Sequence, residues 1–335
     1  MFCKYQNINI TSSIVCVRTS KGRVFMNNEK SKLDYLYDFL SPKIRNAIFS
    51  ISEMERMRLQ EIRMRLNKKL TVTAFGKEYY VTADGRLMTN SDLGIDISQE
   101  EIDFTYKRAF KNSLHSFQRE ISRGYITVAG GNRIGFCGTA VLKPSENFMI
   151  ETIKNISSLN IRIAREVLGV GQTIYQKAFI NGASSLIIAG PPSSGKTTVL
   201  RDLCRLLGNE YRISLIDERN EIAAVENGVS QNQVGMFTDI FNSYNKYEGI
   251  MTAVKVMSPM LLVCDEIGSK EDAKALEYAI NSGVKLIATC HAADFDQLKH
   301  RPVISKLLKE KVFDFGAILG TGSVCGQLQS FYKFT

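Results

Sequence analysis

The chain has 335 residues, of which 44% are hydrophobic and 23% are charged, and its formal net charge at pH 7 is +9. This length allows two domains, and the apolar residues suffice for a core in each. The sequence has no run of about eighteen apolar residues and no signal-peptide layout at its N-terminus, so we expect any membrane contact to be peripheral.

The positive charge is confined to the first half of the chain. Residues 1–180 contain 27 Lys and Arg against 17 Asp and Glu, whereas residues 181–335 contain 16 against 17. A basic domain attracts polyanions such as nucleic acid, anionic lipid, nucleotide or an acidic partner, although a solvated surface is the ordinary explanation. The densest basic stretch comprises Arg56, Arg58, Arg63, Arg65, Lys68 and Lys69.

Seven cysteines are scattered along the chain without any C-x-x-C spacing. An odd number in this pattern argues against a structural zinc site and against a disulfide framework. Several fall in predicted strands, where a free cysteine behaves as a small apolar residue. We therefore expect a reducing, cytoplasmic environment and no structural metal. The cysteines are Cys3, Cys16, Cys137, Cys204, Cys264, Cys290 and Cys325.

Residues 1–30 form an extension for which two explanations stay open. The run from Ile14 to Val17 favours a strand. Alternatively, Met26 is the natural first residue, or the extra residues are a poorly ordered addition.

The next segment mixes helical and strand patterns. Apolar spacing and caps predict helices over 31–49, 53–65 and 100–119, with a new start at Ser41-Pro42 inside the first. In the basic stretch, the interleaved apolar residues favour a helix that passes into a strand. Alternating residues predict strands over 70–74, 79–82, 124–128 and 133–142. We place a domain boundary within 167–182.

A glycine-rich segment, GPPSSGKTT, lies between the apolar run 185–189 and a helical pattern of leucines. It fits G-x-x-x-x-G-K-[ST], in which backbone N–H groups point inward around phosphates. Lys196 is expected to reach the β- and γ-phosphates and Thr197 to ligate Mg²⁺, with help from the helix N-terminus. A turn between two core elements is the alternative. The predicted phosphate-binding residues are Gly190, Pro191, Pro192, Ser193, Ser194, Gly195, Lys196, Thr197 and Thr198.

A second apolar run, residues 260–264, ends in Asp265 and Glu266. In an open parallel sheet, side chains at this end of a strand face the ligand crevice. We assign Asp265 to Mg²⁺ and Glu266 to the attacking water. An acidic turn that caps the next helix is the alternative, because Ser269 to Asp272 resembles a capping box.

Two further predicted strands end in polar residues. Residues 212–216 lead into Asp217 and Glu218, which compete with Glu266 for the role of catalytic base. Residues 284–289 lead into His291. A lone histidine is more often packed or solvated, but its place at a strand end beside these acids favours a functional role.

The segments GPPSSGKTT, LIDERNEI, LLVCDEIG and ATCHA resemble, in order, the Walker A, Asp, Walker B and His boxes of the secretion ATPase superfamily. Longer segments such as LQEIRMRLNKKLTV and GYITVAGGNRIGFCG are similar to the stage III sporulation protein AA family of endospore-forming bacteria. The resemblance covers about residues 32–315. Arg219 stands where the wider superfamily often has proline, which leaves the catalytic base open.

The resemblance implies an α/β fold with a RecA-like P-loop core, in which helices cover both faces of a parallel sheet. A smaller N-terminal α+β domain precedes this core, and nucleotide binds between the two. We assign residues 31–170 to the first domain, 171–335 to the second, and 1–30 to an extension outside the resemblance. The resemblance also implies that Arg133, Arg162 and Arg165 reach the phosphates.

The function implied by the resemblance is that of an ATP hydrolase that uses ATP and Mg²⁺. It would energise assembly of, or transport through, the channel complex between mother cell and forespore. The implied partners are further copies in a homo-oligomer, plausibly a hexamer, and membrane-embedded channel subunits at the inner face of the mother-cell membrane. His291 and the Asp box are candidate nucleotide sensors. A nucleic-acid-stimulated RecA-like motor and a nucleotide-gated scaffold with little turnover are the alternatives.

Overall fold

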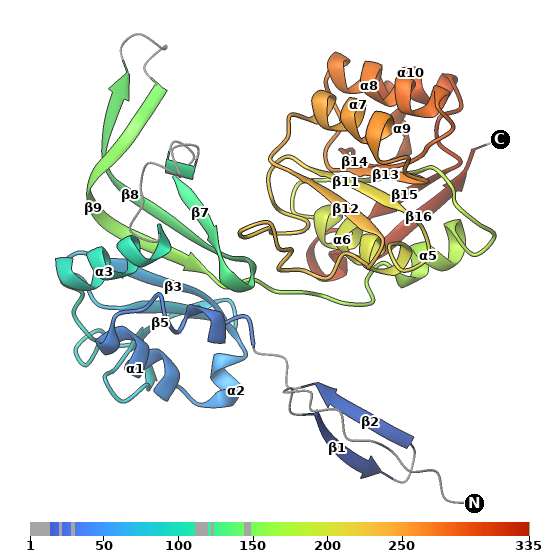
Figure 1. The fold of residues 1–335 in the computed structure, drawn as a ribbon. Helices are drawn as coiled ribbons and strands as arrows, with labels where there is room; N and C mark the ends of the chain where they lie inside the picture. The colour runs from blue at the N-terminus through green and yellow to red at the C-terminus, as the bar shows by residue number, and fades with distance from the viewer. Residues whose placement is uncertain are drawn as a thin grey trace, which may run out of the picture.

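The computed structural model describes residues 14–19, 22–27, 31–110, 120–121, 124–143 and 149–334. They form two large domains, each built on a seven-stranded sheet, and a separate two-stranded hairpin (Figure 1). In the hairpin, β1 (Ile14–Thr19) pairs antiparallel with β2 (Gly22–Asn27). The strand predicted from Ile14 is therefore confirmed.

The N-terminal domain has an entirely antiparallel sheet in the order β6-β5-β4-β3-β9-β8-β7. Buried aliphatic side chains on one face of this sheet form a continuous core with the helices. The elements are η1 (Asp34–Leu36), α1 (Pro42–Ser50), α2 (Glu53–Arg56), β3 (Leu59–Arg65), β4 (Thr71–Ala74), β5 (Lys77–Val81), β6 (Leu87–Met88), α3 (Gln99–Ala109), β7 (Tyr125–Val128), η3 (Ala129–Gly131), β8 (Asn132–Lys143) and β9 (Met149–Arg162).

Two of the predicted helices in this domain were wrong in part. The helix expected over 31–49 is only the short η1 and α1, because Ser41 before proline adopts an extended ψ of 153°. The helix expected over 53–65 ends at Arg56, and β3 follows. A bulge in β3 between Leu59 and Glu61 places the buried Leu59 and Ile62 three residues apart, which imitates helical spacing.

The other predictions for this domain are largely confirmed. The strands predicted over 70–74 and 79–82 form the β4–β5 hairpin, and those over 124–128 and 133–142 form β7 and β8. The helix predicted over 100–119 is confirmed as α3 to Ala109, and its remainder from residue 111 lies outside the described residues. The long partner strand β9 was not predicted. Pairing of β9 with both β3 and β8 sets Arg162 directly opposite Glu61 and Arg133.

The C-terminal domain contains a sheet in the order β12-β11-β13-β14-β10-β15-β16. Every neighbouring pair is parallel except β15–β16. Its elements are α5 (Gln172–Ala178), β10 (Leu186–Gly190), α6 (Lys196–Leu207), β11 (Ile213–Asp217), β12 (Thr238–Asn242), α7 (Lys246–Val256), β13 (Leu261–Cys264), α8 (Lys270–Asn281), β14 (Lys285–His291), α9 (Phe295–His300), α10 (Pro302–Lys309), β15 (Phe315–Leu319), η4 (Gly322–Val324) and β16 (Leu328–Lys333).

Helices cover both faces of this sheet, as predicted (Figure 1). Helices α7 to α10 pack on one face and share a core with side chains such as Ile187 and Ala189. Helices α5 and α6 pack on the other and share a core with Leu186 and Ile188. Consecutive residues of β10 thus enter opposite cores, which is why the strand is a continuous apolar run.

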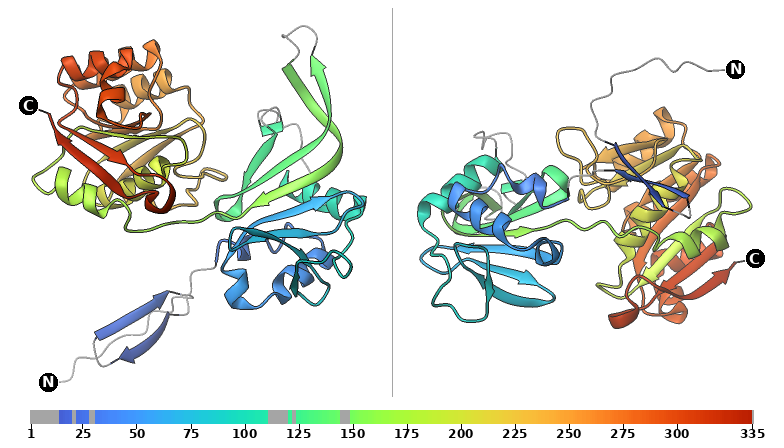
Figure 2. Two further views of the ribbon diagram at one scale, coloured as in Figure 1. Left: turned by 180° about the vertical axis from the view of Figure 1, so that it is seen from behind. Right: turned by 90° about the horizontal axis from the view of Figure 1, so that it is seen from below.

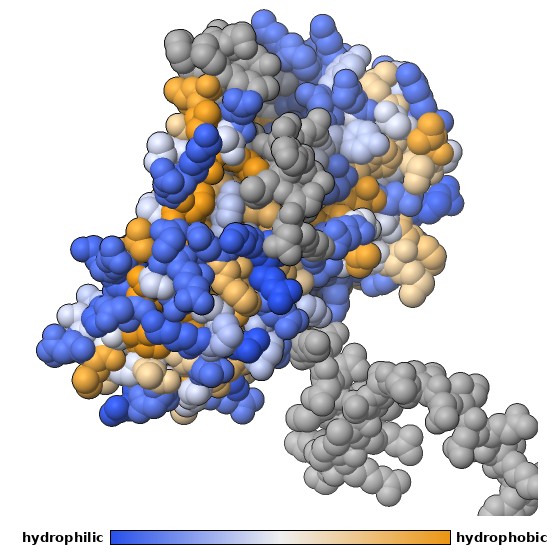
Figure 3. Space-filling model, turned by 60° about the vertical axis from the view of Figure 1, so that its left-hand side comes forward, coloured by the Kyte–Doolittle hydropathy of each residue, from blue (hydrophilic) through white to orange (hydrophobic). Residues whose placement is uncertain are grey.

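A single extended segment joins the domains, which lie side by side (Figure 2). The N-terminal sheet ends at Arg162 and α5 begins at Gln172, so the predicted boundary at 170/171 falls within the joining segment. No helix in the described parts of the chain has the length and apolarity needed to cross a bilayer. One face of the molecule is largely hydrophilic, with apolar side chains in small groups (Figure 3).

Candidate nucleotide site

The loop from Gly190 to Lys196 connects the end of β10 to the start of α6. Gly195, the residue before the helix, has a φ of 84°, a left-handed conformation that glycine adopts without strain. At Gly190, an added Cβ would lie 2.2 Å from the buried Ser194 Oγ. Gly195 is thus favoured by its backbone conformation and Gly190 by the lack of room beside Ser194. The strand, loop and helix follow in the predicted order.

Lys196 lies at the centre of the site with its ammonium group turned back onto the loop. Its Nζ donates to the carbonyl oxygens of Gly190, at 2.9 Å, and Pro191, at 2.8 Å. It also lies 3.1 Å from His291 Nδ1. Burial lowers the pKa of Lys196, against the opposing attraction of Asp265 and Glu266. A bound polyphosphate would give this ammonium group a negatively charged partner in direct contact.

Asp265 connects the phosphate loop with two other strands. Thr197 Oγ1 donates to Asp265 Oδ2 at 3.0 Å, and Thr289 Oγ1 donates to Asp265 Oδ1. The residues come from α6, the end of β13 and β14, whose carboxyl ends meet at this edge of the sheet. A hydroxyl and a carboxylate side by side are hard oxygen ligands, which suit Mg²⁺.

Glu266 is held on both carboxylate oxygens. His291 Nε2 lies 2.9 Å from Oε1, and Arg219 Nη1 lies 2.9 Å from Oε2. His291 thus lies between Lys196, on its Nδ1 side, and Glu266, on its Nε2 side. The Glu266 backbone is also fixed, with a left-handed φ of 47° and its carbonyl accepting from Lys246 Nζ at 2.7 Å.

The two acids that compete with Glu266 lie in different surroundings. Asp217 is 2% exposed, and its carboxylate accepts from the backbone N–H groups of residues 221, 222 and 223 at 2.8, 3.0 and 2.9 Å. Burial raises the pKa of Asp217, although these amides oppose the shift. Glu218 has a half-exposed side chain whose nearest cation is Lys246, 3.9 Å away.

The three arginines of the N-terminal domain diverge. Arg133 reaches the other domain, where Nη1 pairs with Glu221 Oε1 at 2.9 Å and Nη2 donates to the Asn220 carbonyl at 3.3 Å. Arg162 is 67% exposed and lies 3.4 Å from Glu61 Oε1. Arg165 points back into its own domain, donating to the carbonyl oxygens of residues 58 and 59.

Other contacts between the domains surround that of Arg133. Gln231 binds the N-terminal domain through its carbonyl, 2.6 Å from Lys32 Nζ, and through its side chain, 2.9 Å from the Gly130 amide. Glu166 of the joining segment accepts from the Gln233 amide at 2.9 Å. The loop after β11 therefore carries most of these contacts, and it starts at Asp217, beside the nucleotide site.

A cavity of about 490 Å³ opens between the domains at these residues. This volume is within the range of about 300–1,000 Å³ typical of small-molecule sites. The predicted residues that do not line it are Gly190, Pro191, Pro192, Asp217, Glu218 and Arg165. Arg165 and Thr197 share the wall of an adjoining cavity. The predicted site residues that line it are Arg133, Arg162, Ser193, Ser194, Gly195, Lys196, Thr197, Thr198, Asp265, Glu266 and His291.

The sequence matches the family described as Sporulation stage III, protein AA over residues 30–334. The chain belongs to this family. Stage III sporulation protein AA of Bacillus subtilis (strain 168) is 31% identical over 288 residues, which cover 84% of this chain and 89% of that protein.

Two solved structures of secretion and pilus ATPases are similar to this chain. The pilus retraction motor PilT with bound ADP has a TM-score of 0.52 and 11% identity, covering 78% of this chain and 74% of that one. The ATPase DotB of Legionella pneumophila has a TM-score of 0.49 and 15% identity, covering 79% and 72%. The similarity to PilT shows a shared fold, and the predicted P-loop α/β architecture is confirmed.

Three residues of the site were not assigned by sequence reasoning. Thr289 bridges the two acids, because its Oγ1 also accepts the Glu266 N–H at 2.8 Å. The sequence feature that could have identified Thr289 is its position as a polar residue near the end of an apolar strand. Arg219, which binds the Glu266 side chain, also follows an apolar strand, but no role was assigned to it. Lys246, which binds the Glu266 backbone, gave no such signal, since only the fold brings α7 to that acid.

The basic stretch is partly neutralised within its own domain. Arg63 pairs with Glu61 at 2.7 Å, and Lys69 pairs with Asp96 at 2.9 Å. Arg56 donates to the Phe49 carbonyl and lies over its ring. These contacts favour the ordinary explanation of a structured, solvated surface over a dedicated polyanion site.

Proposed function

We propose that this chain is a Mg²⁺-dependent ATPase that hydrolyses ATP in the cavity between its two domains. One observation supports this most: Lys196, Asp265, Glu266 and His291 converge at the carboxyl ends of β10, β13 and β14. His291 directly contacts both Lys196 and Glu266, and Thr289 links Asp265 to the Glu266 amide. Phosphate binding, metal binding and water activation thus have adjacent side chains in a single network.

Each residue has a chemical role in this proposal. The loop N–H groups and Lys196 bind the phosphates, for which the ammonium group leaves its carbonyl partners. Thr197 and Asp265 hold Mg²⁺, which when bound neutralises charge on the phosphates. Glu266 orients the water for in-line attack on the γ-phosphate. Its carboxylate accepts a hydrogen bond from that water once its contacts with neighbouring cations rearrange.

The second domain takes part through its arginines. Arg133 and Arg162 lie on neighbouring strands at the wall of the same cavity, and guanidinium groups bind phosphate oxygens well. Arg133 is tied to Glu221 and Asn220, so its movement onto a phosphate would alter the contact between the domains. In this way ATP and ADP would favour different domain arrangements. The orientation of Arg165 gives it a structural role in this proposal.

The cellular role that we propose follows from the family. The ATPase works as a homo-oligomer, with a hexamer as the assembly to test, at the inner face of the mother-cell membrane, and energises the channel complex between mother cell and forespore. Membrane-embedded channel subunits would be its partners. Family membership supports this role.

Phosphate release by purified variants tests the chemistry. Lys196→Ala should bind neither ATP nor ADP, and Glu266→Gln should bind ATP yet lose about 10²–10⁴-fold in kcat, the usual contribution of a positioned acid or base. Glu218→Gln is the matched control, because this carboxylate lies outside the cavity, and it should retain the wild-type rate. Wild-type rates in the Lys196 and Glu266 variants would refute the proposal.

The mass of the particle in solution tests the assembly. With Mg²⁺ and a non-hydrolysable ATP analogue, the mass should rise to several times that of the 37.6 kDa chain or an existing ring should tighten. A strict monomer under both conditions would contradict the oligomer. Stimulation of hydrolysis by single-stranded DNA, in a salt-dependent manner, would favour a nucleic-acid motor instead.

A further inference from the structure

Arg219 occupies an unusual place among the arginines at the cavity. It follows β11 by two residues and lies in the C-terminal domain, on the same chain segment as the buried Asp217. Its Nη1 lies 2.9 Å from Glu266 Oε2, yet its side chain is 64% exposed. It lines the cavity together with the phosphate loop.

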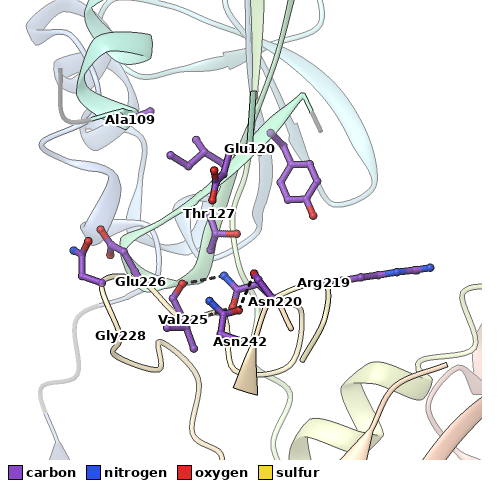
Figure 4. A pocket seen from close by; sticks show the side chains of 13 residues that line it. Ala109, Glu120, Thr127, Arg219, Asn220, Val225, Glu226, Gly228 and Asn242 are labelled. Atoms are coloured by element: carbon purple, nitrogen blue, oxygen red, sulfur yellow. Dashed lines mark hydrogen bonds between the residues drawn. The ribbon is translucent and has the colours of Figure 1, made fainter. Parts of the chain in front are cut away.

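The backbone on either side of Arg219 is held by hydrogen bonds, whereas its side chain is exposed. Asp217 holds the start of the loop through three amides. Asn220, with a left-handed φ of 54°, exchanges two hydrogen bonds with Val225, its Nδ2 donating to the carbonyl and its Oδ1 accepting from the amide. Arg219 is among the residues that line the pocket in Figure 4, and its side chain extends away from Asn220 and Val225. Arg219 therefore presents a long, exposed side chain on a fixed backbone.

The partner of Arg219 is easily exchanged. An ion pair as exposed as this one stabilises little, because solvent screens it. A triphosphate offers several negative oxygens, and the planar guanidinium group binds phosphate in a bidentate manner. The other arginines at the cavity have their own carboxylates, Arg133 on Glu221 and Arg162 on Glu61. Arg219 is the one paired with the acid that serves as base in the proposed mechanism.

We propose that Arg219 exchanges partners when the triphosphate binds. Without nucleotide, or with ADP, it holds Glu266 Oε2. With ATP, it moves onto the terminal phosphate and leaves Glu266 Oε2 to accept a hydrogen bond from the attacking water. This inference rests on the proposed ATPase function and deepens it, since Arg219 then distinguishes ATP from ADP and withholds Glu266 until the substrate is present.

Nucleotide affinities of an Arg219→Ala variant test the exchange. Calorimetry with Mg²⁺ should give a loss of about ten- to hundredfold in affinity for a non-hydrolysable ATP analogue, the size expected for a charge-assisted hydrogen bond. Affinity for ADP should change by less than about twofold, because ADP lacks the group that Arg219 binds. Arg219→Lys should recover part of the discrimination. The exposed side chain of Arg219 makes loss of folding unexpected, and circular dichroism checks it.

Arg212→Ala provides the matched control. Arg212 precedes β11 at the opposite end of the strand and is exposed, so this variant should keep both affinities. If Arg219→Ala leaves the ratio of the two affinities unchanged, the exchange is refuted. The ATPase proposal stands in that event if Lys196→Ala abolishes binding of both nucleotides. If the wild-type chain binds neither nucleotide, both proposals fall.

Discussion

Replacement of Asp217 separates a structural acid from a catalytic one. Its carboxylate accepts from three backbone N–H groups at 2.8 to 3.0 Å, and Asp217 is 2% exposed. Asp217→Ala therefore leaves three donors, two buried and one partly buried, without this partner. At about 1–2 kcal/mol for each unsatisfied amide, the variant should lose about 3–6 kcal/mol in free energy of unfolding. Asp217→Asn keeps an oxygen for two of the amides and should lose about 1–2 kcal/mol. Since burial raises the pKa of Asp217, removal of its charge offsets part of that loss.

Urea unfolding followed by circular dichroism measures these losses, in the transition of the parallel-sheet domain. Glu218→Ala is the control: its half-exposed neighbouring carboxylate should change stability by less than about 0.5 kcal/mol. A loss below about 1 kcal/mol for Asp217→Ala would refute the structural role. So would a folded Asp217→Asn variant with about a hundredfold lower kcat, which would make Asp217 the base.

Three other predictions concern the nucleotide site. Burial raises the pKa of the Cys264 and Cys290 thiols to about 12, so iodoacetamide should modify them only after denaturation, as mass spectrometry of the peptides would show. Gly190→Ala places a Cβ 2.2 Å from a buried hydroxyl and should weaken ADP binding by more than about tenfold, whereas Gly268→Ala, with open space at its Cβ, should not. Burial lowers the pKa of Lys196, and bound phosphate raises it again. At pH values above the lowered pKa, nucleotide binding is therefore accompanied by uptake of a proton by Lys196. In the wild type, the Kd for ADP should therefore increase as the pH is raised towards 10.5, the ordinary pKa of lysine. In Lys196→Arg, the Kd for ADP should not change over this pH range.

Much of the nucleotide core could be predicted from the sequence because its signals are local. The strand before the phosphate loop, the loop and the helix after it are contiguous, and each has its own pattern of apolar residues and glycines. The acids after β13 and the histidine at the end of β14 follow from the rule that strand ends meet at one edge of a parallel sheet. Ser269 and Asp272 form the capping box that the sequence suggested at the start of α8. The capped helix and the acids Asp265 and Glu266 are therefore both present and are not alternatives.

Tertiary structure decided how the polar residues at that edge are used. Asp217 ends β11 and Glu266 lies two residues after β13, so both are at the carboxyl end of a strand. Yet one is enclosed by three amides and the other faces the cavity between an arginine and a histidine. Spacing along the chain contains no information on that difference, because burial and hydrogen bonding depend on loops that fold back from distant positions.

The N-terminal domain depended still more on long-range pairing. The bulge in β3 disguised its alternation as helical spacing, and β9 became recognisable only as the strand between β3 and β8. The same pairing aligns Arg133 and Arg162 at the cavity and turns Arg165 away from it. The sequence by itself determined which groups are available for phosphate chemistry, since their motifs are local. Only the packing of two sheets decided which of those groups meet, because charges interact through space and their distances are set by strand order and domain contact.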